Sequence, residues 1–137
     1  MLSHPMRRLP LILIAAVVLV ACGEEGISVA PQDHAAAQIF VNHCAGCHTL
    51  QQAGTQGSAT NVRTREYKDG PNFNQRHETK NCVLYAIRNG GFSSGPMPQD
   101  IVTGQEAQEV AAFVAKYSKQ LTTSGAPTVR PPDCPAG

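Results

Sequence analysis

The stretch Cys44-Ala45-Gly46-Cys47-His48 decides how this chain folds. Two cysteines lie three positions apart at the end of a predicted helix, and a histidine follows the second cysteine directly. Residues three apart lie on the same face of a helix, so both thiols point to one side. His48 can present an imidazole nitrogen to that side. The stretch therefore predicts that two sulfurs and one nitrogen hold a single group.

This spacing is the attachment signal of a c-type heme. A structural zinc site would need four protein ligands, and Cys82 and Cys134 stand far apart instead of forming a second close pair. A thioredoxin-like dithiol needs a βαβ context, which the sequence lacks. A plain disulfide would leave His48 unexplained. We therefore expect one covalent heme, bound through Cys44 and Cys47, with His48 as an axial ligand.

The second axial ligand follows by elimination. Two of the three methionines belong to a predicted leader, which leaves Met97, placed between two prolines. The prolines restrict the backbone around a flexible thioether, and His/Met pairs are common in cytochromes c. Two alternatives stay open. Met97 packs on an apolar surface as an ordinary loop residue, or His77 takes the sixth position instead.

The first residues have the pattern of an export signal. Two arginines precede an apolar run of about 13 residues, too short for a membrane span of roughly 20. The run closes with Leu-Val-Ala-Cys at 19–22, which resembles a bacterial lipobox. We expect residues 1–21 to be removed and Cys22 to carry lipid. The alternative is an ordinary cleavable signal. Either signal places the protein outside the cytoplasm. With lipid, it is anchored at the extracytoplasmic face of a bacterial membrane, in the periplasm or at the cell surface.

The remaining cysteines and the charge complete this picture. Cys82 and Cys134 form an even pair in an oxidising compartment and are a candidate disulfide. The formal charge of +1 includes Arg7 and Arg8 of the leader, so the mature chain carries about −1. That balance argues against a broad nucleic-acid-binding surface.

Three helices are expected, with no convincing strand pair. The first follows an N-cap at Asp33 and runs into Cys44, and the second spans about 79–89 and stops at a Gly-Gly pair. The third begins at a capping box from Thr103 to Glu106 and has apolar residues at 110, 113, 114 and 117. Residues 49–75 show no period, as in a loop that wraps a cofactor, and a disordered insertion is the alternative. The predicted organisation is a linker at 22–32, an all-α domain at 33–120 and an irregular tail at 121–137.

Together these features resemble a class I cytochrome c, over about residues 33–118. Phe40 precedes Cys44 by four residues, and Gly-Pro-Asn-Phe at 70–73 resembles the family's Gly-Pro-Asn-Leu segment. The resemblance implies that the Pro71 carbonyl accepts a hydrogen bond from His48. It also implies that Phe40 and Tyr117 meet where the first and last helices cross.

The resemblance extends to function. It implies one-electron transfer, without a catalytic constellation of the chain's own, between redox partners such as a membrane oxidase or reductase complex. No Trp is present to meet a heme propionate, and Tyr85 or Arg88 are the candidates for that role. The rival class is a heme-based ligand sensor or a peroxidase-type enzyme, which would need a displaceable Met97. A mobile carrier and a fixed subunit of a larger complex remain equally open.

Overall fold

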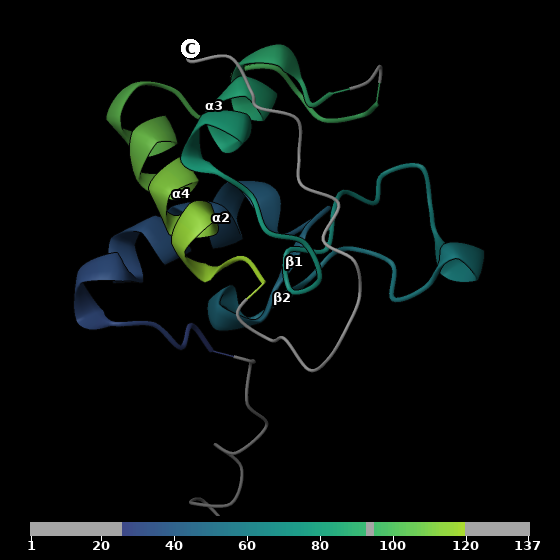
Figure 1. The fold of residues 1–137 in the computed structure, drawn as a ribbon, viewed down its shortest axis with the longest axis horizontal. Helices are drawn as coiled ribbons and strands as arrows, with labels where there is room; N and C mark the ends of the chain where they lie inside the picture. Colours follow the sequence, from purple (N-terminus) through teal and green to yellow (C-terminus); the bar gives the residue numbers. More distant parts are fainter. Residues whose placement is uncertain (1–25, 93–94, 120–137) are drawn as a thin grey trace, which may run out of the picture.

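Three helices and their connecting loops make up the computed structural model, which describes residues 26–92 and 95–119 (Figure 1). The helices are α2 (His34–Cys44), α3 (Lys80–Asn89) and α4 (Gly104–Tyr117). Short 3-10 turns lie at η1 (Pro31–Asp33), η2 (Gln51–Ala53) and η3 (Val62–Thr64). The predicted all-α, three-helix fold is confirmed, and none of the described helices is long and apolar enough to cross a membrane.

The core forms where α4 packs against both α2 and α3. The predicted apolar stripe of α4 is buried at all four positions, 110, 113, 114 and 117. Phe40 of α2 meets Phe113 of α4 at 6.0 Å between ring centroids, and its other neighbour is Phe73 at 6.1 Å. Tyr117 packs against Phe113 at 5.0 Å. Phe40 and Tyr117, which the resemblance places in contact, thus both pack against the Phe113 ring.

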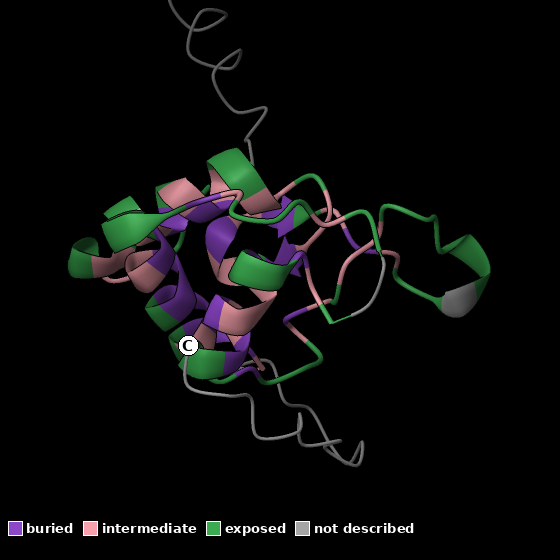
Figure 2. Cartoon of the chain, turned by 90° about the horizontal axis from the view of Figure 1, so that it is seen from above, coloured by how far each residue is buried: buried purple, intermediate pink, exposed green. Residues whose placement is uncertain are grey.

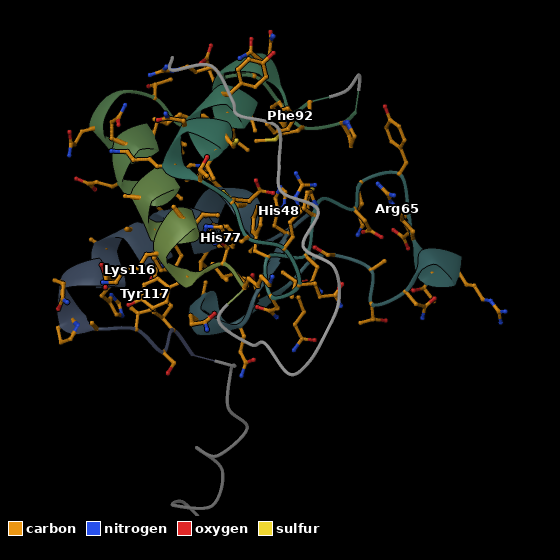
Figure 3. The ribbon with its side chains drawn as sticks, viewed as in Figure 1. His48, Arg65, His77, Phe92, Lys116 and Tyr117 are labelled. Atoms are coloured by element: carbon orange, nitrogen blue, oxygen red, sulfur yellow. The ribbon has the colours of Figure 1, made fainter. Side chains whose placement is uncertain are left out.

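Asp33 stands at the N-cap of α2 as predicted, but its carboxylate makes no capping hydrogen bond. The carboxylate instead accepts the Tyr117 hydroxyl at 2.7 Å and forms an ion pair with Lys116 (Figure 3). These hydrogen bonds, from Lys116 first and then from Tyr117, lower the pKa of Asp33. Because Tyr117 also accepts the Ala30 amide at 3.3 Å, the end of α4 is tied to the start of α2.

The ends of α3 and α4 follow the sequence only in part. Thr79 caps α3 by accepting the Cys82 amide at 3.2 Å, and Gly90 ends the helix with φ of 69°. That backbone conformation favours glycine, as the Gly-Gly pair predicts. Thr103 stands at the N-cap of α4 without a side-chain capping hydrogen bond, so the predicted capping box is wrong.

The long connection between α2 and α3 is mostly irregular, as predicted. It contains one small strand pair that the sequence does not predict, β1 (Thr49–Leu50) antiparallel to β2 (Thr55–Gln56). Beyond it, residues 59–69 extend from the body of the molecule and are largely exposed (Figure 2). Next to the strand pair, the Gly57 amide donates to the His48 carbonyl at 3.2 Å, which holds this part of the loop against the end of α2.

Candidate functional site

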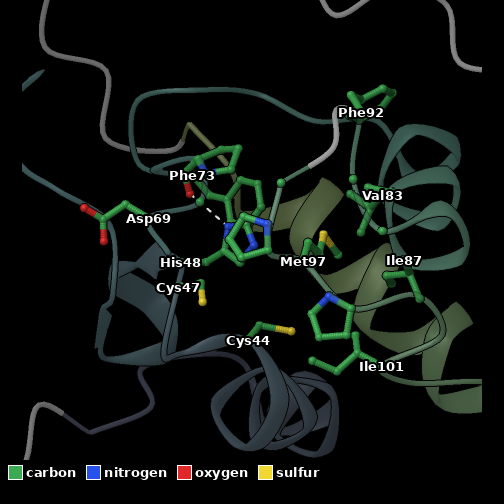
Figure 4. Close-up of a pocket in the computed structure, with 18 of the residues that line it drawn as sticks. Cys44, Cys47, His48, Asp69, Phe73, Val83, Ile87, Phe92, Met97 and Ile101 are labelled. Atoms are coloured by element: carbon green, nitrogen blue, oxygen red, sulfur yellow. Dashed lines mark hydrogen bonds between the residues drawn. The ribbon is translucent and has the colours of Figure 1, made fainter. Parts of the chain in front are cut away.

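A cavity of about 880 Å³ opens between α2, α3, α4 and the loops that connect them. Most of its walls are apolar, and Phe40 is among the lining residues. Phe73, Val83, Ile87 and Ile101 line it as well (Figure 4). Its volume lies in the upper part of the range for ligand and cofactor sites. A protein without Trp and with few aromatic residues thus has a large, mostly apolar cavity between its three helices.

Cys44, Cys47 and His48 line this cavity together (Figure 4). Cys44 is the last residue of α2, and its carbonyl accepts the amides of Cys47 at 3.2 Å and of His48 at 3.0 Å. This tight turn carries both thiols and the imidazole to the same space. Both cysteines are free thiols. Burial, reinforced by the nearby Cys47, raises the pKa of Cys44 to about 12, so its sulfur is protonated at neutral pH.

The His48 ring is held on several sides. Its Nδ1 lies 3.1 Å from the Pro71 carbonyl oxygen, and the Phe73 ring stacks on it at 4.8 Å with only 9° between the planes. Burial lowers the pKa of His48, while the Pro71 hydrogen bond opposes that shift. A neutral imidazole that donates from Nδ1 leaves the Nε2 lone pair available to a metal.

Two glycines allow this close packing. A Cβ at Gly70 would lie 2.4 Å from Cε1 of His48, and a Cβ at Gly57 would lie 2.2 Å from the Ala45 carbonyl oxygen. Gly70 belongs to the Gly-Pro-Asn segment that the sequence singles out, whereas no signal identifies Gly57. The stack of Phe73 on His48 also escapes sequence reasoning, because it joins residues from two separate segments.

Met97 lines the same cavity and is half-buried (Figure 4). Its loop is tied to the end of α3, where the Asp100 amide donates to the Ile87 carbonyl at 2.8 Å. The Met97 sulfur also lies 3.8 Å from the position of a Cβ at Gly91. The structure therefore brings into one cavity a thioether, an imidazole and two thiols from segments about 50 residues apart in the chain.

The other candidates take different places. His77 is not among the residues that line the cavity and lies 3.4 Å from the Ser118 hydroxyl, so the structure gives no support to His77 as a ligand. Tyr85 and Arg88 also lie outside the lining, and Tyr85 stacks on Phe92 at 5.2 Å instead. The basic side chains that do line the cavity come from the preceding loops, namely Arg65, Lys68 and Arg76.

Glu78 is a buried acid in the cavity wall that sequence reasoning does not identify. It is 4% exposed and forms an ion pair with Arg76, while its Oε2 has no hydrogen-bond partner. Burial raises the pKa of Glu78, and the nearby Arg76 works in the opposite direction. The cavity wall therefore contains a buried carboxylate with one oxygen paired to Arg76 and the other without a hydrogen-bond partner.

The donor set fits a heme better than a bare metal ion. Within 26–92 and 95–119, no three His, Cys, Asp or Glu side chains gather as a metal-binding cluster. Two free thiols, one oriented imidazole and one thioether around a large apolar cavity match the requirements of a covalent heme with His/Met ligation. The fit rests on the size and the apolar lining of the cavity as well as on the donors.

Cys82 lies in α3, is 1% exposed and takes part in a disulfide, unlike Cys44 and Cys47. Cys22 and Cys134 both lie outside the described residues, as do the predicted leader at 1–21 and the predicted tail at 121–137. The pairing of Cys82 with Cys134 stays a prediction.

Comparison with protein families gives one match. The family model described as Cytochrome c covers residues 34–118, which is more than half of the chain. Curated proteins and solved structures give no match. The matched range begins with α2 and ends just after α4, so it includes every element that lines the cavity.

Proposed function

Because this chain belongs to the cytochrome c family, whose members transfer electrons through heme, we propose that it carries single electrons with one covalent heme. In this proposal Cys44 and Cys47 form the thioether links, and His48 and Met97 are the axial ligands. The observation that supports it best is the convergence of these four side chains on one apolar cavity.

Each part of the chain has a role in this proposal. When bound, the heme supplies a centre that gains or loses one electron without breaking bonds. The Pro71 carbonyl orients His48 and strengthens its donation. The apolar wall from α3 and α4 keeps water from the centre, and the proline-flanked loop keeps Met97 in place. His48 and Met97 would hold the group in both oxidation states, so little rearrangement would accompany electron transfer.

Substitution of Met97 separates the carrier from its rival. The native protein should be low-spin in both oxidation states and should bind carbon monoxide poorly. Met97→Ala should lower the reduction potential and let carbon monoxide bind, because the thioether is gone. Ile101→Ala, which changes the same cavity and keeps all four proposed attachment and ligand residues, is the matched control. A native protein that is high-spin and binds carbon monoxide rapidly would favour a ligand sensor or peroxidase.

The covalent attachment is tested separately. Protein matured in its native host should keep its heme through denaturing electrophoresis and show the mass of one added heme. Extraction of the heme by acid and organic solvent would refute the thioether links. Cys44→Ser/Cys47→Ser is the matching variant, and it should lose the heme band altogether.

The site of action is also a proposal. A lipid on Cys22 would hold the domain at the extracytoplasmic face of a membrane, close to a membrane oxidase or reductase complex, as a carrier or a fixed subunit. A diacylated cysteine supplies the two chains that stable anchoring needs. Mass spectrometry of the mature N-terminal peptide should find acylated Cys22, and Cys22→Ser should move the protein to the soluble fraction. A mature N-terminus beyond Cys22 would refute the anchor.

A further inference from the structure

The Ser58 hydroxyl contacts the carbonyl oxygen that accepts the hydrogen bond orienting His48. Its hydroxyl lies 3.0 Å from the Pro71 carbonyl oxygen, which is the same atom that lies 3.1 Å from Nδ1 of His48. Ser58 belongs to the loop just after β2, and 13 residues separate it from Pro71. This serine lies outside the sequence motifs described above, so its contact with the site is visible only in the folded chain.

The hydroxyl proton of Ser58 is directed to Pro71 by its surroundings. The Ser58 oxygen accepts the Thr49 amide at 2.9 Å, so its single proton is free to be donated elsewhere. The other acceptor in reach is the Cys47 carbonyl at 3.4 Å, which already accepts the Gly70 amide at 2.8 Å. The shorter contact, to Pro71, is therefore the hydrogen bond that forms.

A reciprocal pair keeps Ser58 in this position. The Thr49 hydroxyl accepts the Ser58 amide at 3.0 Å, while the Ser58 hydroxyl accepts the Thr49 amide. Both side chains are buried, at 8% and 9% exposure. Because each residue satisfies the backbone of the other, the Ser58 hydroxyl has little freedom to turn away from Pro71.

Two donors on one carbonyl oxygen compete for its electron density. The Nδ1 hydrogen bond of a metal-bound histidine raises the basicity of the ring, and a stronger bond favours the more positive oxidation state of the metal. A second donor on the same oxygen makes it a poorer acceptor and weakens that bond. The hydroxyl of Ser58 therefore moderates how strongly His48 donates.

We propose that Ser58 is a positioning residue that raises the reduction potential by sharing the Pro71 carbonyl with His48. The proposal rests on the proposed function, because it requires His48 to be a heme ligand. It concerns only the size of the potential and leaves the ligand set unchanged. A low-spin native spectrum therefore tests the function, and the variants below test the role of Ser58.

The test compares Ser58→Ala with Thr49→Val in the holoprotein. Thr49→Val breaks the other half of the reciprocal pair and keeps the shape of the side chain, but it leaves the Pro71 carbonyl shared. Ser58→Ala should shift the equilibrium toward the oxidised form threefold to tenfold, which is about 30 to 60 mV because tenfold equals 59 mV for one electron. The Nδ1 proton of His48 should also move downfield in the NMR spectrum of the reduced protein. Thr49→Val should change neither, and Ser58→Thr should restore both.

Three results would overturn the proposal. Equal potential shifts in Ser58→Ala and Thr49→Val would reduce Ser58 to a packing role, and no shift in Ser58→Ala would remove the role altogether. If Ser58→Ala yields no holoprotein, the unaltered reduced protein decides. It must show a Ser58 hydroxyl proton protected from exchange, with a nuclear Overhauser effect to the Nδ1 proton of His48. Absence of that signal overturns the proposal.

Discussion

Gly57 supports the turn that presents both cysteines, and replacing it tests the geometry of that turn. A Cβ at Gly57 would lie 2.2 Å from the Ala45 carbonyl oxygen and 2.7 Å from the Cys47 amide nitrogen. Ordinary contacts are about 3.5 to 4.0 Å, so one of the two segments would have to move by roughly 1 Å or more. Both opposing atoms belong to the backbone, and no change of rotamer can relieve the clash.

The expected cost of Gly57→Ala follows from that displacement. Overpacking in a close-packed region costs about 1–3 kcal/mol. Moving the segments would also strain the hydrogen bond from the Gly57 amide to the His48 carbonyl, 3.2 Å long and worth about 1 kcal/mol. The restriction of the unfolded chain returns about 0.4–1 kcal/mol. The net loss is therefore about 1–3 kcal/mol, and each kcal/mol lowers Tm by about 4–8 °C in a domain of this size.

Gly46→Ala is the matched control, because Gly46 lies in the same turn and a Cβ there would meet no atom within 4 Å. We expect this control to keep the stability and heme yield of the unaltered protein. Both variants should be matured in one host and compared by heme content per protein and by thermal unfolding. Gly57→Ala should lose on both measures. Equal heme content and equal Tm in the two variants would refute the contact between Gly57 and the turn.

Two further predictions concern the buried polar groups. Burial raises the pKa of Glu78 above its ordinary value of 4.5, so the stability that this group contributes is complete below that value and is lost as pH rises through the folded-state pKa. Glu78→Gln should therefore gain stability relative to the unaltered protein between pH 4 and pH 7 in denaturant unfolding. The control Glu106→Gln, at an exposed position, should show no such trend. A relative loss of stability in Glu78→Gln would mean that the ion pair with Arg76 outweighs the cost of burying the carboxylate. Tyr117→Phe should cost about 1–2 kcal/mol, because the Ala30 amide and the Asp33 carboxylate each lose a partner, and a loss no greater than that of a surface substitution would contradict the tie between α2 and α4.

The sequence predicts the helices and the donor residues because these signals are local. The cysteines and His48 are neighbours in the chain, and the apolar positions of α4 repeat with the helical period. Met97 could be identified for a similar reason, since it is the only methionine beyond the predicted leader. In each case, the residues that allow the prediction lie close together in the sequence or, like Met97, are the single residue of their type after the predicted leader.

The failures have the opposite character. Thr103 could form a capping box, yet its side chain makes no capping hydrogen bond, and Asp33 uses its carboxylate for α4 rather than for its own helix. A local sequence pattern indicates which hydrogen bonds a side chain is able to form, and its neighbours in the folded chain decide which of these hydrogen bonds form. The two-residue strands β1 and β2 are too short to show any alternation.

The parts of the site that surround His48 could not be predicted for a related physical reason. Phe73 stacks on the ring, Gly57 supports its turn and Ser58 shares its acceptor, and all three belong to segments without helical or strand periodicity. Their positions are fixed by hydrogen bonds to Thr49, His48 and the Cys47 turn. These hydrogen bonds join the irregular loop to the turn that carries Cys47 and His48. A change in the loop sequence should therefore alter the surroundings of His48 directly, because Phe73 stacks on its ring and Ser58 shares its acceptor.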